Sequence, residues 1–202
     1  MIDVKEKEIL IVGGGSVGLR KSKKLLKEGA YVKVLSKDIH PDFEELKKRY
    51  PEKLSLIKKE YKESYLNGAY LVFAATSEIR INEKIRMDCS LKKILCNNTS
   101  NQRNSDFYNQ AYMTKDDLTI SVSTNGGSPG AAKKILEYLE SSLDNDLLIK
   151  LKEHSKIRKY IIENYKEGKT RKMHLNTLLN TEMEKLKIFR DKLMSEEIDN
   201  EY

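Results

Sequence analysis

The sequence predicts an α/β protein whose first part is a Rossmann-like, doubly wound parallel sheet. Three observations support this prediction. Short apolar runs alternate with segments of helical spacing, the first run ends in a glycine-rich loop, and the connections are too short for anything but right-handed crossovers. A smaller α+β segment and a helical C-terminal domain follow. We place the limits at residues 1–112, 113–145 and 146–202.

Five short apolar runs are typical of strands that are buried on both faces of a parallel sheet. The first run is apolar after its opening glutamate and ends directly in glycines. The fourth is again nearly all apolar. The strands are expected over residues 8–12, 31–35, 54–57, 71–75 and 94–97.

Helices are expected between these strands, over residues 17–28, 40–50 and 79–90. In the first helix, Val17, Ser22, Leu25 and Leu26 share one face, which should pack on the sheet. The residues expected to face outward are all basic: Arg20, Lys21, Lys23, Lys24 and Lys27. Gly29 should end this helix as its C-cap, because glycine readily adopts the left-handed conformation of such ends.

The pattern changes in the second half of the chain. Residues 118–123 alternate between apolar and small polar side chains, which indicates a strand with one solvated face. A loop of small residues, 124–130, precedes an expected helix over 131–143. From residue 146 the pattern is helical, with Gly168 separating two helices and residues 196–202 expected to fray.

The composition indicates a globular protein with a strongly charged surface and a net charge of +7 over 202 residues. No run approaches the ~20 apolar residues of a membrane span, and Asp3, Glu6 and Glu8 interrupt any signal-peptide core. We therefore expect a cytoplasmic protein without a membrane partner. Its lysines are not interleaved with aromatic residues, so no nucleic-acid partner is expected. A substrate with many carboxylates, or no ligand at all, would suit this charge equally well.

The two cysteines, Cys89 and Cys96, have neither a second cysteine pair nor nearby histidines, so they do not predict a zinc site. Structural disulfides are rare in a reducing cytoplasm. We expect two free, buried thiols, and no residue is assigned to a metal.

The loop after the first strand has the pattern Gly13-x-Gly15-x-x-Gly18 and opens a helix. The first glycine permits a tight turn, the second lets the backbone approach a diphosphate, and the third lets helix and strand pack closely. Unpaired N–H groups and the helix dipole favour negative charge at this point. The loop therefore predicts a dinucleotide-binding site.

The end of the second strand should lie near the adenosine ribose, where a carboxylate usually binds the 2′-hydroxyl. Ser36 stands where the acid is expected, and Asp38 comes two residues later. Asp38 could bind the ribose and favour NAD, whereas Lys37 could accommodate the 2′-phosphate of NADP. An ordinary polar turn is a third interpretation, so the residues alone leave this choice open.

Four segments together resemble the precorrin-2 dehydrogenase / sirohydrochlorin ferrochelatase family, the N-terminal module of sirohaem synthases and its free-standing relatives. They are Ile-Leu-Ile-Val-Gly-Gly-Gly-Ser-Val-Gly-Leu-Arg-Lys at 9–21, Leu-Val-Phe-Ala-Ala-Thr at 71–76, Asp-Leu-Thr-Ile-Ser-Val-Ser-Thr at 117–124 and Gly-Ser-Pro at 127–129. The similarity covers residues 1–145, and the chain length and helical tail suit the free-standing form. Gly-Gly-Gly followed by Arg-Lys, combined with the later Gly-Ser-Pro loop, makes the resemblance specific.

The resemblance implies NAD-dependent oxidation of precorrin-2 to sirohydrochlorin in sirohaem biosynthesis, and some relatives also insert Fe²⁺ into the product. It implies a homodimer, with residues 113–143 forming the interface, so that 113–145 would be a dimerisation segment. The anionic tetrapyrrole would bind in a cleft between the nucleotide domain and the partner's dimerisation segment. Its many carboxylates would suit a basic rim.

The resemblance also suggests which residues contact each ligand. The cofactor NAD, with NADP not excluded, would contact the glycine loop and neighbouring residues: Gly13, Gly15, Ser16, Val17, Gly18, Lys37, Asp38 and Thr76. Four residues are candidates for the substrate: Arg20, Lys21, Thr124 and Ser128. Solvated charges are an equally simple interpretation of Arg20 and Lys21. A helix N-cap is the favoured interpretation of Ser128, although its loop could also present N–H groups to substrate carboxylates.

One position departs from the family pattern. The family carries an aspartate after the fifth strand, in an Asn-x-x-Asp pattern, and that residue is credited in both activities. The matching residues here are Asn97-Asn98-Thr99-Ser100, so Ser100 occupies the aspartate position, and Asp106 is no obvious substitute. A serine is a poor general base unless another group activates it, and a poor metal ligand. Because hydride transfer depends mainly on positioning, we expect dehydrogenation to survive and chelation to be weak or absent.

Two further functions remain open from the sequence. The first is a non-catalytic nucleotide- or tetrapyrrole-binding module, a sensor or carrier, and Ser100 is the feature in its favour. The second is a regulatory nucleotide-binding domain of the ion-transport type, which shares the glycine loop. The Gly-Ser-Pro loop and the helical tail argue against the second.

Overall fold

The computed structural model describes residues 2–116, 118–125 and 127–198. The chain divides into two compact units, Met1–Asn109 and Gln110–Tyr202. The further division of the second unit at residue 145 stays a prediction.

The first unit is built on a parallel five-stranded sheet with the strand order β3-β2-β1-β4-β5. From β1 the chain winds outward to β2 and β3, and it then returns to the other side of β1 for β4 and β5. This confirms the predicted doubly wound fold, whose direction reverses between β1 and β4. The strands are β1 (Glu8–Gly14), β2 (Tyr31–Ile39), β3 (Leu54–Lys58), β4 (Leu71–Ala74) and β5 (Leu95–Asn98).

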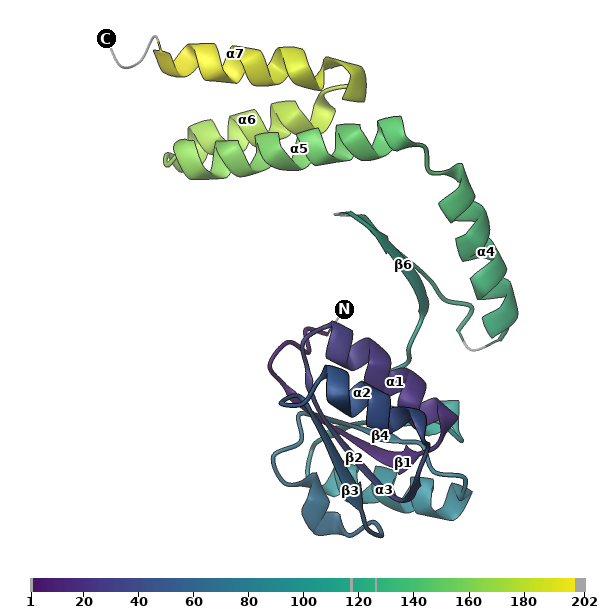
Figure 1. Cartoon of the computed structure of the whole chain (residues 1–202). Helices are drawn as coiled ribbons and strands as arrows, with labels where there is room; N and C mark the ends of the chain where they lie inside the picture. The colour runs from purple at the N-terminus through teal and green to yellow at the C-terminus, as the bar shows by residue number, and fades with distance from the viewer. Residues whose placement is uncertain (1, 117, 126, 199–202) are drawn as a thin grey trace. The chain divides into compact units, whose positions relative to one another are not determined.

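Helices cover both faces of this sheet because alternate strand residues point in opposite directions (Figure 1). One set, including Ile9 and Val32, packs against α1 (Ser16–Lys27) and α2 (Asp42–Arg49). The other set, including Leu10 and Val72, packs against α3 (Ile79–Leu91). Two short 3₁₀ turns, η1 (Glu63–Leu66) and η2 (Gln102–Asn104), complete the unit.

The end of α1 confirms the predicted glycine cap. Gly29 has φ +84°, and its N–H donates to the carbonyl of Leu26, while the N–H of Ala30 donates to that of Leu25. This is the Schellman arrangement of a helix end. The predicted helix face was partly wrong, because Leu19 and Lys21 are buried together with Ser22 and Leu26.

Strand β2 is longer than predicted, since it runs on to Ile39. Lys37 and Asp38 therefore lie in a strand and not in a turn. The glycine loop explains the difference: Gly14 pairs with Ile39 after a register shift, and a Cβ at Gly14 would lie 2.5 Å from the carbonyl oxygen of Asp38. Without a side chain at Gly14, β2 can extend past the end of β1.

The second unit starts with an antiparallel hairpin of β6 (Ala111–Lys115) and β7 (Leu118–Val122), against which α4 (Pro129–Ser142) packs. The alternating pattern of residues 118–123 predicted β7. Strand β6 was missed because Met113 is its single buried residue, which leaves almost no apolar alternation in the sequence.

The rest of this unit is helical, as predicted, but it contains three described helices where two were expected. They are α5 (Asn145–Asn164), α6 (Gly168–Asn180) and α7 (Leu186–Ile198), with a 3₁₀ turn, η3 (Met183–Lys185), before the last. Their shared core is Ile157, Ile161, Leu178, Leu186 and Leu193.

Helix α7 runs to Ile198, and residues 199–202 of the segment expected to fray lie outside the described part. Residue 117, the first of the segment 117–124, and residue 126, just before the segment 127–129, also lie outside it. Within the described ranges, no helix combines the length and apolar composition that crossing a bilayer requires.

Candidate functional site

Two glycines of the first loop are required by packing within the protein. Gly13 has φ +124°, and a Cβ there would lie 2.1 Å from the carbonyl oxygen of Ala75. A Cβ at Gly18 would lie 2.1 Å from the carbonyl oxygen of Gly13. Gly13 therefore allows the β1 turn to pass the end of β4, and Gly18 allows α1 to lie close to β1.

Gly15 differs, because a Cβ there would meet no protein atom within 4 Å. It is the N-cap of α1, offers no side-chain cap, and is followed by a first turn without acidic residues. The first N–H groups of a helix have no intrahelical partner, and the helix dipole makes this end positive. An exposed backbone with free donors and no side chain above it fits the diphosphate of a dinucleotide, with Ser16 and Val17 supplying N–H groups.

Acidic side chains surround Lys37 at the end of β2. Its Nζ lies 2.9 Å from Oε1 of Glu60, just beyond β3, and both side chains are exposed. Glu60 is the main cause of a raised Lys37 pKa, and the carboxylates of Glu78 and Asp38 add to it. The sequence analysis missed Glu60 because a contact between residues 23 positions apart leaves no local pattern.

A buried amide joins the loops that follow β4 and β5. Asn82, near the start of α3, is 0% exposed. Its Oδ1 accepts from the Thr76 N–H at 3.0 Å and from the Thr76 hydroxyl at 2.8 Å. Its Nδ2 donates to the Thr76 carbonyl at 3.0 Å and to the Ser100 hydroxyl oxygen. Thr76 and Ser100, both candidates from the sequence, are thus brought together by a residue that the sequence analysis missed.

Ser100 is exposed, and its backbone N–H donates to Oδ1 of the buried Asn98 at 3.0 Å. Both carboxylate oxygens of Asp106 are engaged within the protein. One accepts from the Cys96 N–H at 2.9 Å and the other pairs with Arg86 at 2.6 Å. Asp106 thereby covers the open edge of β5.

Lys21 points into the protein, so the prediction that it faces outward is wrong. It is 9% exposed, its Nζ donates to Oδ1 of Asn97 at 3.2 Å, and it lies 4.2 Å from the Phe73 ring centre. Burial, then the charges of Arg20 and Lys24, lower the Lys21 pKa to about 8. Arg20 remains exposed on α1.

The remaining substrate candidates lie in the second unit. Ser128 is the N-cap of α4: its hydroxyl accepts from the Ala131 N–H at 3.3 Å. Its own N–H donates to the Thr124 hydroxyl at 2.9 Å. The capping interpretation of Ser128 is therefore confirmed, and the Thr124 hydroxyl stabilises the same loop through this hydrogen bond.

The two cysteines are free and buried, as expected. Their thiols hydrogen-bond to each other, which together with burial raises the pKa of Cys89. Among the described residues, no cluster of three metal-ligating side chains exists.

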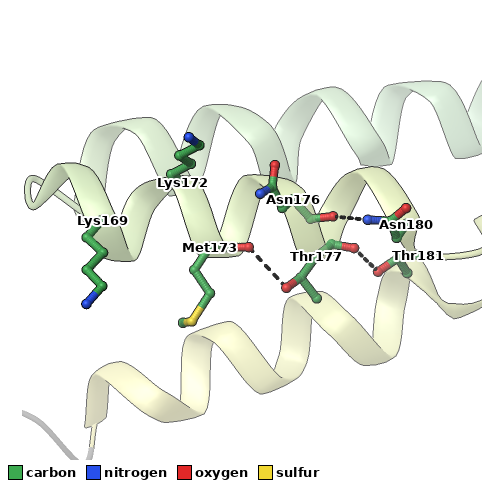
Figure 2. Close-up of a pocket in the computed structure, with 7 residues that line it drawn as sticks. All are labelled: Lys169, Lys172, Met173, Asn176, Thr177, Asn180 and Thr181. Atoms are coloured by element: carbon green, nitrogen blue, oxygen red, sulfur yellow. Dashed lines mark hydrogen bonds between the residues drawn. The ribbon is translucent and has the colours of Figure 1, made fainter.

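A groove also runs along α6 in the second unit (Figure 2). Three of its polar side chains bond to their own helix: the Thr177 hydroxyl donates to the Met173 carbonyl at 3.1 Å, the Thr181 hydroxyl to the Thr177 carbonyl at 2.8 Å and the Asn180 amide to the Asn176 carbonyl at 2.8 Å. The hydroxyls of Thr177 and Thr181 and the amide of Asn180 are therefore engaged within α6 and not directed at a ligand.

Residues 1–111 match a protein family described as "Putative NAD(P)-binding". A precorrin-2 dehydrogenase of Bacillus subtilis is 30% identical over 149 residues, which are 73% of this chain and 89% of that protein. Sirohaem synthases of Zymomonas mobilis and Buchnera aphidicola are 29% and 30% identical over 72% of this chain, but the match covers only 30% of each synthase. The solved structure of SirC, a precorrin-2 dehydrogenase, has a TM-score of 0.74 at 23% identity, over 96% of this chain and 98% of that one.

Proposed function

Because the chain belongs to the family of precorrin-2 dehydrogenases and sirohaem synthases, we propose that it oxidises precorrin-2 to sirohydrochlorin with NAD. The observation that supports this most is the α1 N-terminus at the carboxyl edge of the sheet, where Gly15 exposes unpaired backbone donors. NAD⁺ would supply the hydride acceptor. The protein's task is to fix the geometry of cofactor and substrate, which is the main protein contribution to such a reaction.

The charge of the first unit suits an anionic tetrapyrrole. Acidic and basic residues balance in Gln110–Tyr202, so the excess of +7 belongs to Met1–Asn109. Arg20 is the exposed cation of the Arg-Lys pair and is proposed to face substrate carboxylates. Lys21 is buried against Asn97, and we assign it to the packing of α1 rather than to substrate contact.

The direct test is an anaerobic assay of NADH formation from precorrin-2, followed by absorbance at the NADH band. We expect turnover by the unmodified chain. Binding of NAD⁺ without any turnover would contradict the dehydrogenase and favour the alternative, a nucleotide- or tetrapyrrole-binding module.

We propose NAD as the cofactor because of the charges at the end of β2. Lys37 already pairs with Glu60, and Asp38 and Glu78 add two further carboxylates nearby. The 2′-phosphate of NADP would meet an acidic surface, whereas a 2′-hydroxyl can donate to a carboxylate.

Reversing the charge of Glu60 should therefore weaken the preference for NAD. In Glu60→Lys, Lys37 loses its partner and a second cation is added, so we expect the affinity ratio of NADP⁺ to NAD⁺ to rise roughly tenfold or more. Glu52→Lys, an exposed change before β3, is the matched control and should leave the ratio unchanged. Calorimetric titration with both cofactors measures the ratio, and equal ratios in all three proteins would contradict the proposal.

We propose that chelatase activity is weak or absent, because Ser100 stands at the family aspartate position and a serine hydroxyl is a poor metal ligand and a poor general base. Ser100→Asp restores a carboxylate next to the Asn82 amide, which can donate to it. We expect this variant to insert Fe²⁺ into sirohydrochlorin several-fold faster than the unmodified chain. Fast insertion by the unmodified chain, or no response to the change, would show that residue 100 does not control this reaction.

A homodimer through the second unit is also proposed. On α4, Ala132 and Leu136 are buried, whereas Ile135 and Tyr138 are 45% and 71% exposed. Large apolar side chains on an exposed helix face are typical of subunit interfaces. The molecular mass in solution, from light scattering, checks this proposal.

A further inference from the structure

The amide of Asn82 has no unused hydrogen-bonding capacity. A side-chain amide offers two donors and one acceptor oxygen. Both donors are used, one by the Thr76 carbonyl and one by the Ser100 hydroxyl oxygen, and the oxygen accepts two bonds from Thr76. The side chain is 0% exposed, and its bonds to Thr76 on one side and to Ser100 on the other join the loops after β4 and β5.

This arrangement determines the direction of the Ser100 hydroxyl. A hydroxyl has one hydrogen and two lone pairs. One lone pair accepts from the Asn82 Nδ2, which has no lone pair of its own to receive the Ser100 hydrogen. The hydrogen must therefore point away from Asn82, and the exposed position of Ser100 leaves it accessible to a ligand. The Ser100 N–H bond to Asn98 fixes the backbone as well.

The position of this hydroxyl suits the reactive half of a bound dinucleotide. A diphosphate above Gly15 with its adenosine toward the end of β2 extends in the other direction to the ends of β4 and β5. Those ends carry Thr76 and Ser100.

We propose that Asn82 is a positioning residue that makes Ser100 a hydrogen-bond donor to a carbonyl or carboxylate oxygen of the bound ligands. This rests on the proposed dehydrogenase function and adds a role for residue 100. The acceptor would be the nicotinamide carboxamide or a tetrapyrrole carboxylate. An aspartate at position 100 would also accept from Asn82, but its carboxylate would offer no donor. The serine thus gives this position a hydrogen-bond donor toward the ligand, where an aspartate would present only acceptors.

The test uses Asn82→Asp and Ser100→Ala in the full chain, alone and together. The aspartate keeps the shape of Asn82 but accepts where the amide donated, so the Ser100 hydrogen turns toward it and is lost to the ligand. We expect each single change to weaken NAD⁺ affinity, or raise the KM for precorrin-2, roughly three- to tenfold. Asn82→Asp also loses the donor to the Thr76 carbonyl. The double variant should nevertheless be no worse than Asn82→Asp alone, because that variant has already lost the Ser100 hydrogen to the ligand.

Matched controls are Asn67→Asp and Ser90→Ala, two exposed positions in the first unit. They should change neither constant. Thermal unfolding of every variant is recorded alongside. Should Asn82→Asp fail to fold, Ser100→Thr replaces it: this change keeps the hydroxyl and should restore the affinity that Ser100→Ala loses.

The two binding constants identify the acceptor. Weaker NAD⁺ binding in calorimetry assigns it to the nicotinamide carboxamide, and a raised KM at unchanged NAD⁺ affinity assigns it to a tetrapyrrole carboxylate. Effects that multiply in the double variant, or Ser100→Ala equal to the unmodified chain in both constants, would overturn the inference and leave the dehydrogenase standing. An unmodified chain that neither binds NAD⁺ nor turns over would overturn both.

Discussion

Gly15→Val should abolish NAD⁺ binding while leaving the protein folded. The new side chain would meet no protein atom at its Cβ, so folding has no steric reason to suffer. It would, however, occupy the space that a diphosphate needs to reach the N–H groups of Ser16 and Val17. Two or three lost charge-assisted hydrogen bonds correspond to at least roughly a 100-fold loss of affinity.

Calorimetric titration with NAD⁺ measures this loss, and urea unfolding checks the fold. We expect the unfolding free energy to fall by no more than about 1 kcal/mol, because valine is a poorer N-cap than glycine. Gly168→Val is the matched control, since a Cβ at this first residue of α6 would also meet no atom within 4 Å. Gly13→Ala should instead unfold the first unit, because its Cβ would collide with Ala75. Normal NAD⁺ binding by Gly15→Val would show that the diphosphate does not bind at this loop.

The buried Lys21 should make the first unit more stable at high pH. Its pKa is 10.5 in the unfolded chain and about 8 in the folded one. Below pH 8 the ammonium is charged in both states, so folding bears the full cost of burying it. Between pH 8 and 10.5 the folded chain has lost this proton and the unfolded chain has kept it. The free energy of unfolding therefore rises with pH over this window, by about 3 kcal/mol in total.

Lys21→Met isolates this effect, because every other titrating group is common to the two proteins. The quantity to compare is the free energy of unfolding of Lys21→Met minus that of the unmodified chain. We expect this difference to fall by about 2.5 kcal/mol between pH 7 and pH 10. Urea unfolding at both pH values gives the difference. The exposed Lys23→Met serves as the control and should show no such change. Parallel pH dependences of Lys21→Met and the unmodified chain would mean that Lys21 keeps its proton when folded.

Local patterns in the sequence were sufficient to predict the sheet and the glycine loop. The tasks assigned to Gly13 and Gly18 depend on spacing alone, and the close approaches to Ala75 and Gly13 confirm both. The family resemblance, drawn from four short segments, is confirmed by the comparisons. Ser128 as a cap followed from its place directly before a helix.

The missed features depend on contacts between distant segments. Helical periodicity placed Lys21 on the solvated face, yet Asn97 and Phe73 on neighbouring strands bury it. Glu60, just beyond β3, pairs with Lys37 of β2, and no local sequence motif predicts this ion pair. Asn82 gave one signal that could have been used: it is a polar residue on the buried face of its helix, three residues before Ile85, and such a residue needs partners.

Titration calorimetry of the unmodified full chain with NAD⁺ tests the central claim most directly, because the proposed dehydrogenase depends on the diphosphate lying over the first turn of α1. The account predicts saturable one-site binding, tighter for NAD⁺ than for NADP⁺. The absence of binding heat with either oxidised cofactor, with or without tetrapyrrole, would contradict it.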